Sequence, residues 1–172
     1  MEALVVLLAI PLAASPCLWF LGERDAAPGV NAAFSLATFL ASAWLTAGVV
    51  SAGPIIAFDE QFFVDPLNVF LVALTAFVAF TTALFSRPYM RVERDKGRMT
   101  PARLRLYHSM YQLFTFTMLL ALTTNNLGIL WVAMEAATLA TVLLVSVYRT
   151  PASLEAAWKY FILCGEIGRA HV

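Results

Sequence analysis

The chain has 172 residues, of which 61% are hydrophobic and 13% charged, with 11 basic side chains against 11 acidic ones. This apolar content excludes an ordinary soluble domain, and a net charge of zero argues against a nucleic-acid-binding protein. The cysteines Cys17 and Cys164 lie in apolar segments without a C-x-x-C motif or a Cys/His cluster, so we expect no zinc, iron–sulfur or haem site and no cofactor.

The composition predicts an all-α, polytopic membrane helix bundle that is embedded in a lipid bilayer. A spanning helix needs about 20 apolar residues; five segments meet that length, and a sixth begins near the C-terminus. They cover residues 3–21, 30–50, 67–85, 106–124, 127–147 and, for the start of the sixth, 151–165. Residues 1–165 are therefore predicted to form the N-terminal portion of one multi-helix membrane domain.

Local signals mark the starts of several helices. Asp65 and Thr100 each precede a proline, and such a pair supplies an N-cap side chain followed by a residue that needs no N–H donor. Pro11 and Pro16 fall inside the first segment, where a membrane helix tolerates them as kinks. The TTNN turn at 123–126 is so short that the helices on either side of it must be antiparallel neighbours.

Charge placement predicts the orientation. The stretch 86–105 carries seven Arg and Lys residues, whereas 51–65 and 123–126 carry none. The positive-inside rule then places the 86–105 loop in the cytoplasm and the N-terminus outside. We interpret this basic stretch as a solvated loop that sets the topology; a docking surface for a soluble partner is the alternative.

One charged residue, Glu135, lies near the middle of the apolar segment 127–147. An ionised carboxylate there costs about 2.5–3.5 kcal/mol on insertion scales, and such groups commonly belong to ion or proton paths. At 100° per residue, its helix face also carries the polar side chains of Thr138 and Ser146. Glu135 is either a buried packing group or a titrating group in an ion or proton path, and the second interpretation explains its polar neighbours.

Four strings carry a resemblance to a known family. FFVDPLNVF begins at Phe62, YHSMYQ at Tyr107, TTNNLGILWVAMEAATLATVLLV at Thr123 and YRTPASLEAAWKYFIL at Tyr148. They resemble the hydrogenase-4 component F family and, more broadly, the antiporter-like subunits of complex I, of membrane-bound hydrogenases and of multisubunit cation/proton antiporters. The similarity covers about residues 62–163. Met134 stands where many complex I members have Trp, which favours the hydrogenase branch.

The resemblance implies two inverted five-helix repeats and a partnership with other membrane subunits of a hydrogenase or complex I type assembly in the plasma (inner) membrane of a prokaryote. Glu135 matches a fifth-helix Glu that pairs with a seventh-helix Lys in the family, and Lys159 matches a Lys near the start of helix six. The predicted proton or ion pathway therefore includes Glu135, Lys159 and Thr138. His108 joins them either as a proton-uptake group or merely as a polar anchor.

Three functions stay open from the sequence. The first is a proton-translocating subunit of an oxidoreductase complex, without a redox centre or catalytic site of its own. The second is a subunit of a cation/proton antiporter, and the third is a structural membrane scaffold. The transported ion is either H⁺ or Na⁺.

The C-terminal residues 166–172 are predicted to be foreign to the protein. Ile167–Val172 is what the string ATC GGA AGA GCA CAC GTC would encode, and that string is a common sequencing-adapter sequence. We therefore expect an N-terminal fragment, in which the seventh-helix Lys of the family would lie beyond the chain.

Overall fold

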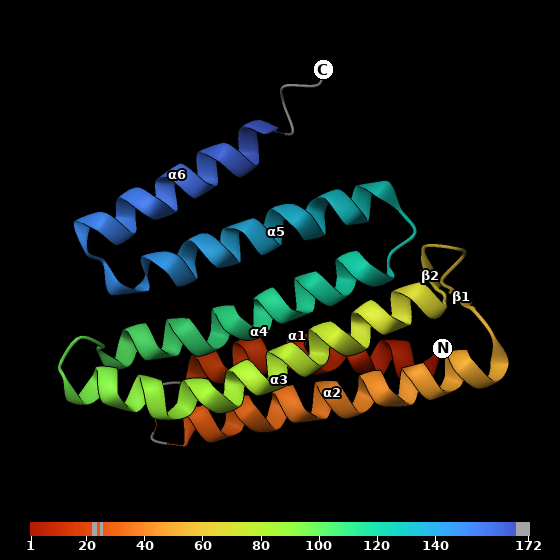
Figure 1. Ribbon diagram of the computed structural model, residues 1–172, viewed down its shortest axis with the longest axis horizontal. Coiled ribbons are helices and arrows are strands. Elements are labelled where there is room, and N and C mark those ends of the chain that lie inside the picture. The colour runs from red at the N-terminus through yellow and green to blue at the C-terminus, as the bar shows by residue number, and fades with distance from the viewer. Residues whose placement is uncertain (22–23, 25, 168–172) are drawn as a thin grey trace.

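The computed structural model describes residues 1–21, 24 and 26–167, with side chains up to Gly165. Over these residues the chain forms six helices, one 3₁₀ turn and one β-hairpin (Figure 1). Of the stretch expected to be foreign, 168–172 lie outside the described residues. The elements are α1 Glu2–Leu21, α2 Ala27–Ala52, β1 Ile55–Ala57, β2 Phe62–Val64, α3 Pro66–Asp95, α4 Pro101–Thr123, α5 Leu127–Val145, the 3₁₀ turn η1 Ser146–Tyr148, and α6 Pro151–Ile167.

The prediction of an all-α membrane helix bundle is confirmed. Among the described residues, four helices are long and apolar enough to cross a membrane: α1, α2, α3, and α5 with η1. Helix α4 is not among these four because its mean hydropathy is lower, although five spanning helices were expected. It nevertheless runs the length of the bundle, because α3 ends and α5 begins at opposite ends of it (Figure 1). Its lower hydropathy comes from polar side chains that are buried against other helices, among them His108, Gln112 and Thr115.

Helix α4 occupies the centre of the arrangement and packs against α1, α3 and α5. Figure 1 shows α5 and α6 stacked on one side of the first four helices, with α6 outermost and diverging from α5. The main apolar core joins α1, α2, α3 and α4 through residues such as Leu7, Leu45, Val72 and Leu119. Helices α1–α4 therefore cover one another, whereas α5 and α6 are the less enclosed part of the bundle, and on α6 only Ala157 is buried among the described side chains.

The prediction that 86–105 is a loop is wrong. Helix α3 continues through Pro88 to Asp95, and the connection to α4 is only five residues, 96–100. At 1.5 Å per residue a 30-residue helix is about 45 Å long, so its last turns extend beyond an apolar layer of about 30 Å. In these last turns of α3 the charged residues continue the helix, so their presence in the sequence does not indicate a loop. The buried Glu93 carboxylate also accepts from Arg98 Nη1 at 3.4 Å, which folds the connection back onto α3.

Both predicted caps are present. Asp65 Oδ1 accepts from Asn68 N–H at 2.7 Å at the start of α3. Thr100 Oγ1 accepts from Arg103 N–H at 3.4 Å at the start of α4. These side chains satisfy amide donors that have no partner within the helix.

The β-hairpin within 51–65 was not predicted. Its strands pair antiparallel with Ile55 opposite Val64, and its turn lies against the α4–α5 turn. Asn125 N–H donates to Gln61 O at 2.7 Å, and Asn126 Nδ2 donates to Gln61 Oε1 at 2.6 Å. The hairpin therefore ties the start of α3 to the end of α4. Three-residue strands are too short to show the alternation by which a strand is recognised in a sequence.

Candidate functional site

Glu135 lies on the side of α5 that faces away from α4. Helix α5 begins at the N-cap Asn126, whose Oδ1 accepts from Gly128 N–H at 2.8 Å. Its buried positions are Ala133, Ala137 and Ala140, a stripe of small residues against α4. At 100° per residue this stripe is about 140–160° around the helix from Glu135. Small side chains let two helix backbones approach closely, so α4 packs on one side and the carboxylate emerges on the other.

The surroundings of Glu135 are half-open. The side chain is half-buried, while Trp131 and Met134 beside it are 64% and 56% exposed. Thr138 Oγ1 donates to Met134 O at 3.0 Å, so its proton is used within its own helix. Among the residues that the structure describes, the Glu135 carboxylate forms neither a hydrogen bond nor an ion pair. It is therefore available to a group that the described residues do not supply.

Lys159 is not brought to Glu135. On α6 its Nζ lies 2.5 Å from Glu155 Oε1, one turn earlier, and the two side chains are 70% and 66% exposed. Between α5 and α6 lies an open, largely apolar cavity of about 300 Å³, lined by Val142 and Ser146 of the Glu135 face and by Trp158 of α6. Part of the helix face predicted around Glu135 thus borders α6, where Ser146 is its polar member.

His108 is on α4, buried among other helices. It is 1% exposed, and neither Nδ1 nor Nε2 has a hydrogen-bond partner among the described residues. One turn along the same face is Gln112, which is fully buried. Gln112 Nε2 lies 2.7 Å from Asn31 Oδ1, 3.0 Å from Ser35 Oγ and 3.2 Å from Asn31 O. We call Asn31, Ser35, His108 and Gln112 the buried polar cluster.

This cluster was not predicted from the sequence, although the spacing of polar residues in the second segment indicates it. Asn31, Ser35, Thr38 and Ser42 are spaced four, three and four residues apart in an otherwise apolar segment, and all four are buried. Polar residues at helical spacing in a membrane helix indicate a face that packs on another helix. In the structure Gln112 of α4 is the partner of Asn31 and Ser35 on this face, whereas the hydroxyls of Thr38 and Ser42 donate within α2.

The cluster and Glu135 are on different sides of α4. Arg103 Nη1 donates to Tyr148 O at 3.3 Å and marks the side of α4 that meets α5 and η1. His108, five residues later, is about 140° around the helix from Arg103. Over residues 1–21, 24 and 26–167, no three His, Cys, Asp or Glu side chains form a group that could hold a metal ion.

Comparison with known proteins agrees with the resemblance stated above. No family model matches the chain. A curated relative from Methylacidiphilum infernorum (isolate V4), named "Hydrogenase-4 component F homolog", is 49% identical over 136 residues, which are 79% of this chain and 27% of the relative. The chain thus spans about a quarter of the length of that relative. Within the length that it covers, the chain belongs with the hydrogenase-4 component F homologues.

Proposed function

We propose that the chain is part of a proton-translocating membrane subunit of a hydrogenase-4 or complex I type oxidoreductase, with Glu135 as the titrating group. The observation that carries the proposal is a carboxylate on a membrane helix, turned away from the helix on which α5 packs and without a described partner. A packing carboxyl would be expected on the buried side, where Ala133, Ala137 and Ala140 lie. The name of the relative, a hydrogenase-4 component F homologue, supports the hydrogenase-type assembly.

The chemistry follows from the cost of a charge in hydrocarbon. An isolated carboxyl is favoured in its neutral form there, and a cation brought close favours the ionised form. Movement of a cation toward or away from Glu135 would therefore load and release a proton. Because Thr138 uses its proton on Met134 O, its oxygen remains able to accept from a protonated carboxyl or a water. Lys159, held by an exposed and weak ion pair, is the described amine closest in sequence to α5.

The same proposal includes the orientation. One end of the bundle holds the C-terminal ends of α1, α3 and α5 and the starts of α2, α4 and α6, and the hairpin and the N-terminus lie at the other end (Figure 1). The first end has Arg24, the basic part of α3 and Arg149. In the plasma membrane of a prokaryote this end would face the cytoplasm, and its partners would be the other membrane subunits of the assembly.

The test replaces the carboxyl without changing its shape. In the intact assembly, reconstituted into sealed vesicles, proton movement is measured per electron transferred for Glu135→Gln and Glu135→Asp. Gln should abolish coupled proton movement or reduce it at least ten-fold, whereas Asp should retain part of it. Glu2→Gln, an exposed carboxyl on α1, is the matched control and should behave as the wild type.

Normal coupled pumping by Glu135→Gln would refute the proposal and leave the scaffold function. Exchange of a sodium gradient for a proton gradient by the wild-type vesicles, without electron transfer, would support the cation/proton antiporter instead.

A further inference from the structure

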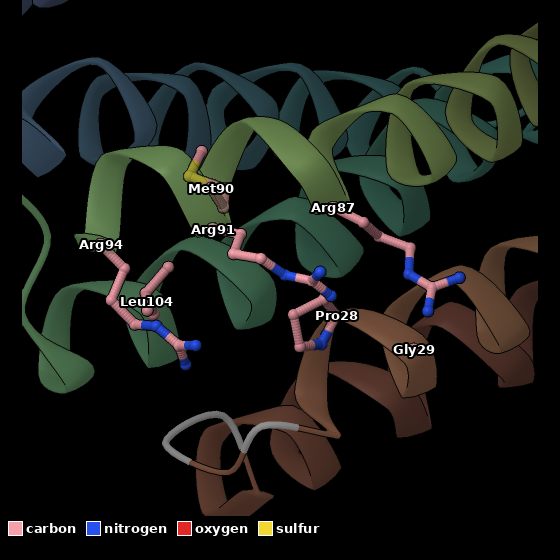
Figure 2. A pocket seen from close by; sticks show the side chains of 7 residues that line it. All are labelled: Pro28, Gly29, Arg87, Met90, Arg91, Arg94 and Leu104. Atoms are coloured by element: carbon pink, nitrogen blue, oxygen red, sulfur yellow. The ribbon is translucent and has the colours of Figure 1, made fainter. Parts of the chain in front are cut away.

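The basic end of the bundle contains a pocket between α2 and α3, with Leu104 of α4 also in its lining. It has a volume of about 220 Å³ and is lined by Pro28, Gly29, Arg87, Met90, Arg91, Arg94 and Leu104. One water needs only about 10–15 Å³, so the pocket admits a group of several heavy atoms. Figure 2 shows Arg87 and Arg91 extending from α3 across to the first turn of α2. A β-carbon added to Gly29 would lie 3.7 Å from Arg87 Nη2, which places that guanidinium directly over the turn.

The pocket concentrates positive charge. Arg87 and Arg91 are four residues apart and so share one face of α3, where like charges repel. They point at the N-terminal end of α2, which carries a partial positive charge and receives no side-chain cap from Ala26. Among the described residues no carboxylate lies within 4.0 Å of Arg87 or Arg91. An anion would relieve both repulsions, and planar guanidinium groups match the oxygens of phosphate.

The position of the pocket selects the kind of phosphate. Arg87 comes 21 residues after Pro66, about 32 Å along α3, which is close to the thickness of the hydrocarbon layer, about 30 Å. A helix that enters the hydrocarbon layer at Pro66 and follows the bilayer normal would therefore bring this guanidinium to the level of the lipid headgroups. The buried side chains of Met90 and Leu104 provide an apolar wall beside the arginines. A phosphodiester joined to acyl chains would meet both parts of this lining, whereas a free phosphate would meet only the arginines.

We propose that the pocket between the first turn of α2 and the basic turns of α3 binds the phosphate of an anionic phospholipid. Arg87 and Arg91 bind the phosphate oxygens, Gly29 leaves room for the headgroup, and Met90 contacts the glycerol end of the acyl chains. Arg94 also lines the pocket, but it has another contact in the structure, and the site does not depend on it.

The experiment uses the protein at its native length, with any subunits that copurify, in nanodiscs of phosphatidylcholine into which phosphatidylglycerol is titrated. Lipids retained by the protein are measured by native mass spectrometry. The wild type should retain phosphatidylglycerol over phosphatidylcholine. Arg87→Gln with Arg91→Gln should weaken phosphatidylglycerol binding about 25-fold, or about five-fold per arginine.

Two further variants separate a built site from general attraction. Lys96→Gln with Arg149→Gln removes the same charge from the same end without touching the pocket, and it should change binding less than about two-fold. Gly29→Leu fills the pocket without changing the charge, and it should weaken binding at least as much as the loss of one arginine. Far-UV circular dichroism confirms that each variant is folded.

Any one of four results would overturn the lipid site. The first is an equal loss of phosphatidylglycerol binding in the two double variants, and the second is the absence of a preference for phosphatidylglycerol in the wild type. The third is full displacement of the lipid by millimolar inorganic phosphate, which would identify a free-phosphate site. Unchanged binding by Gly29→Leu would likewise show that the anion does not enter the pocket.

Discussion

The bond between Gln112 and Asn31 gives the sharpest test of how α4 is held in the bundle. Replacing Gln112 with Leu keeps most of the side-chain volume and removes the donor to Asn31 Oδ1 and Ser35 Oγ. Asn31 Nδ2 already has no partner among the described residues. In Gln112→Leu the whole side-chain amide of Asn31 would therefore be buried without a described partner, and such a group costs about 1–3 kcal/mol.

Measurements on membrane helices give a loss of stability of the same size. Hydrogen bonds between membrane helices contribute on average about 0.6 kcal/mol and at most about 1.7 kcal/mol. Since Gln112 Nε2 has two hydrogens for three nearby acceptors, about two such bonds are lost. We expect Gln112→Leu to lower the free energy of unfolding by about 1–3 kcal/mol. Adding Asn31→Leu should restore part of it, because both buried partners are then apolar.

The assay is a double-mutant cycle, in which far-UV circular dichroism monitors the unfolding of each variant in detergent. The coupling between the two positions should be about 1 kcal/mol or more. Thr81→Val is the control: Thr81 is on α3, away from the cluster, and its hydroxyl bonds only to its own helix, so the change should stay within about 0.5 kcal/mol. Additivity within about 0.3–0.5 kcal/mol would show that Gln112 and Asn31 do not interact and would refute the reasoning.

Two shorter predictions concern the ends of the bundle. On a background without Cys17 and Cys164, Lys96→Cys should react with a membrane-impermeant thiol reagent only from the cytoplasm and Asp59→Cys only from outside; the reverse pattern would invert the proposed orientation. Gln61→Ala removes the acceptor of Asn126 Nδ2, and it should speed proteolysis within the hairpin and lower stability by about 1 kcal/mol. Unchanged cleavage would mean that the backbone bond from Asn125 to Gln61 O suffices to hold the hairpin.

Hydropathy located the membrane helices but not their ends. The apolar parts of α1, α2 and α5 were predicted within a few residues, and the two caps at Asp65 and Thr100 were correct because a cap depends only on neighbours in sequence. The end of α3 was misplaced by ten residues, since a change from apolar to charged residues marks where the bilayer ends and not where the helix ends. The hairpin depends on contacts with the α4–α5 turn, which local sequence does not encode.

For the candidate site, the sequence likewise predicted the position of the key residue but not its contacts. A lone carboxylate in an apolar segment identified Glu135, and the spacing of small residues could have shown which side of α5 packs. The partner of each polar group could not be read from the sequence. Lys159 is paired with its own helix, and Gln112 reaches residues of α2 about 80 positions earlier.

The position of His108 leads to a last prediction. A proton-uptake role requires a route from His108 to Glu135, yet the alanine stripe of α5 fills the contact with α4, and His108 is on the other side of α4. Its ring nitrogens have no described partners, so His108→Leu should change stability by less than about 1 kcal/mol or raise it. In the vesicle assay it should keep coupled proton movement within about two-fold of wild type. A folded His108→Leu protein that moves protons as poorly as Glu135→Gln would join the two sites in one pathway and contradict this separation.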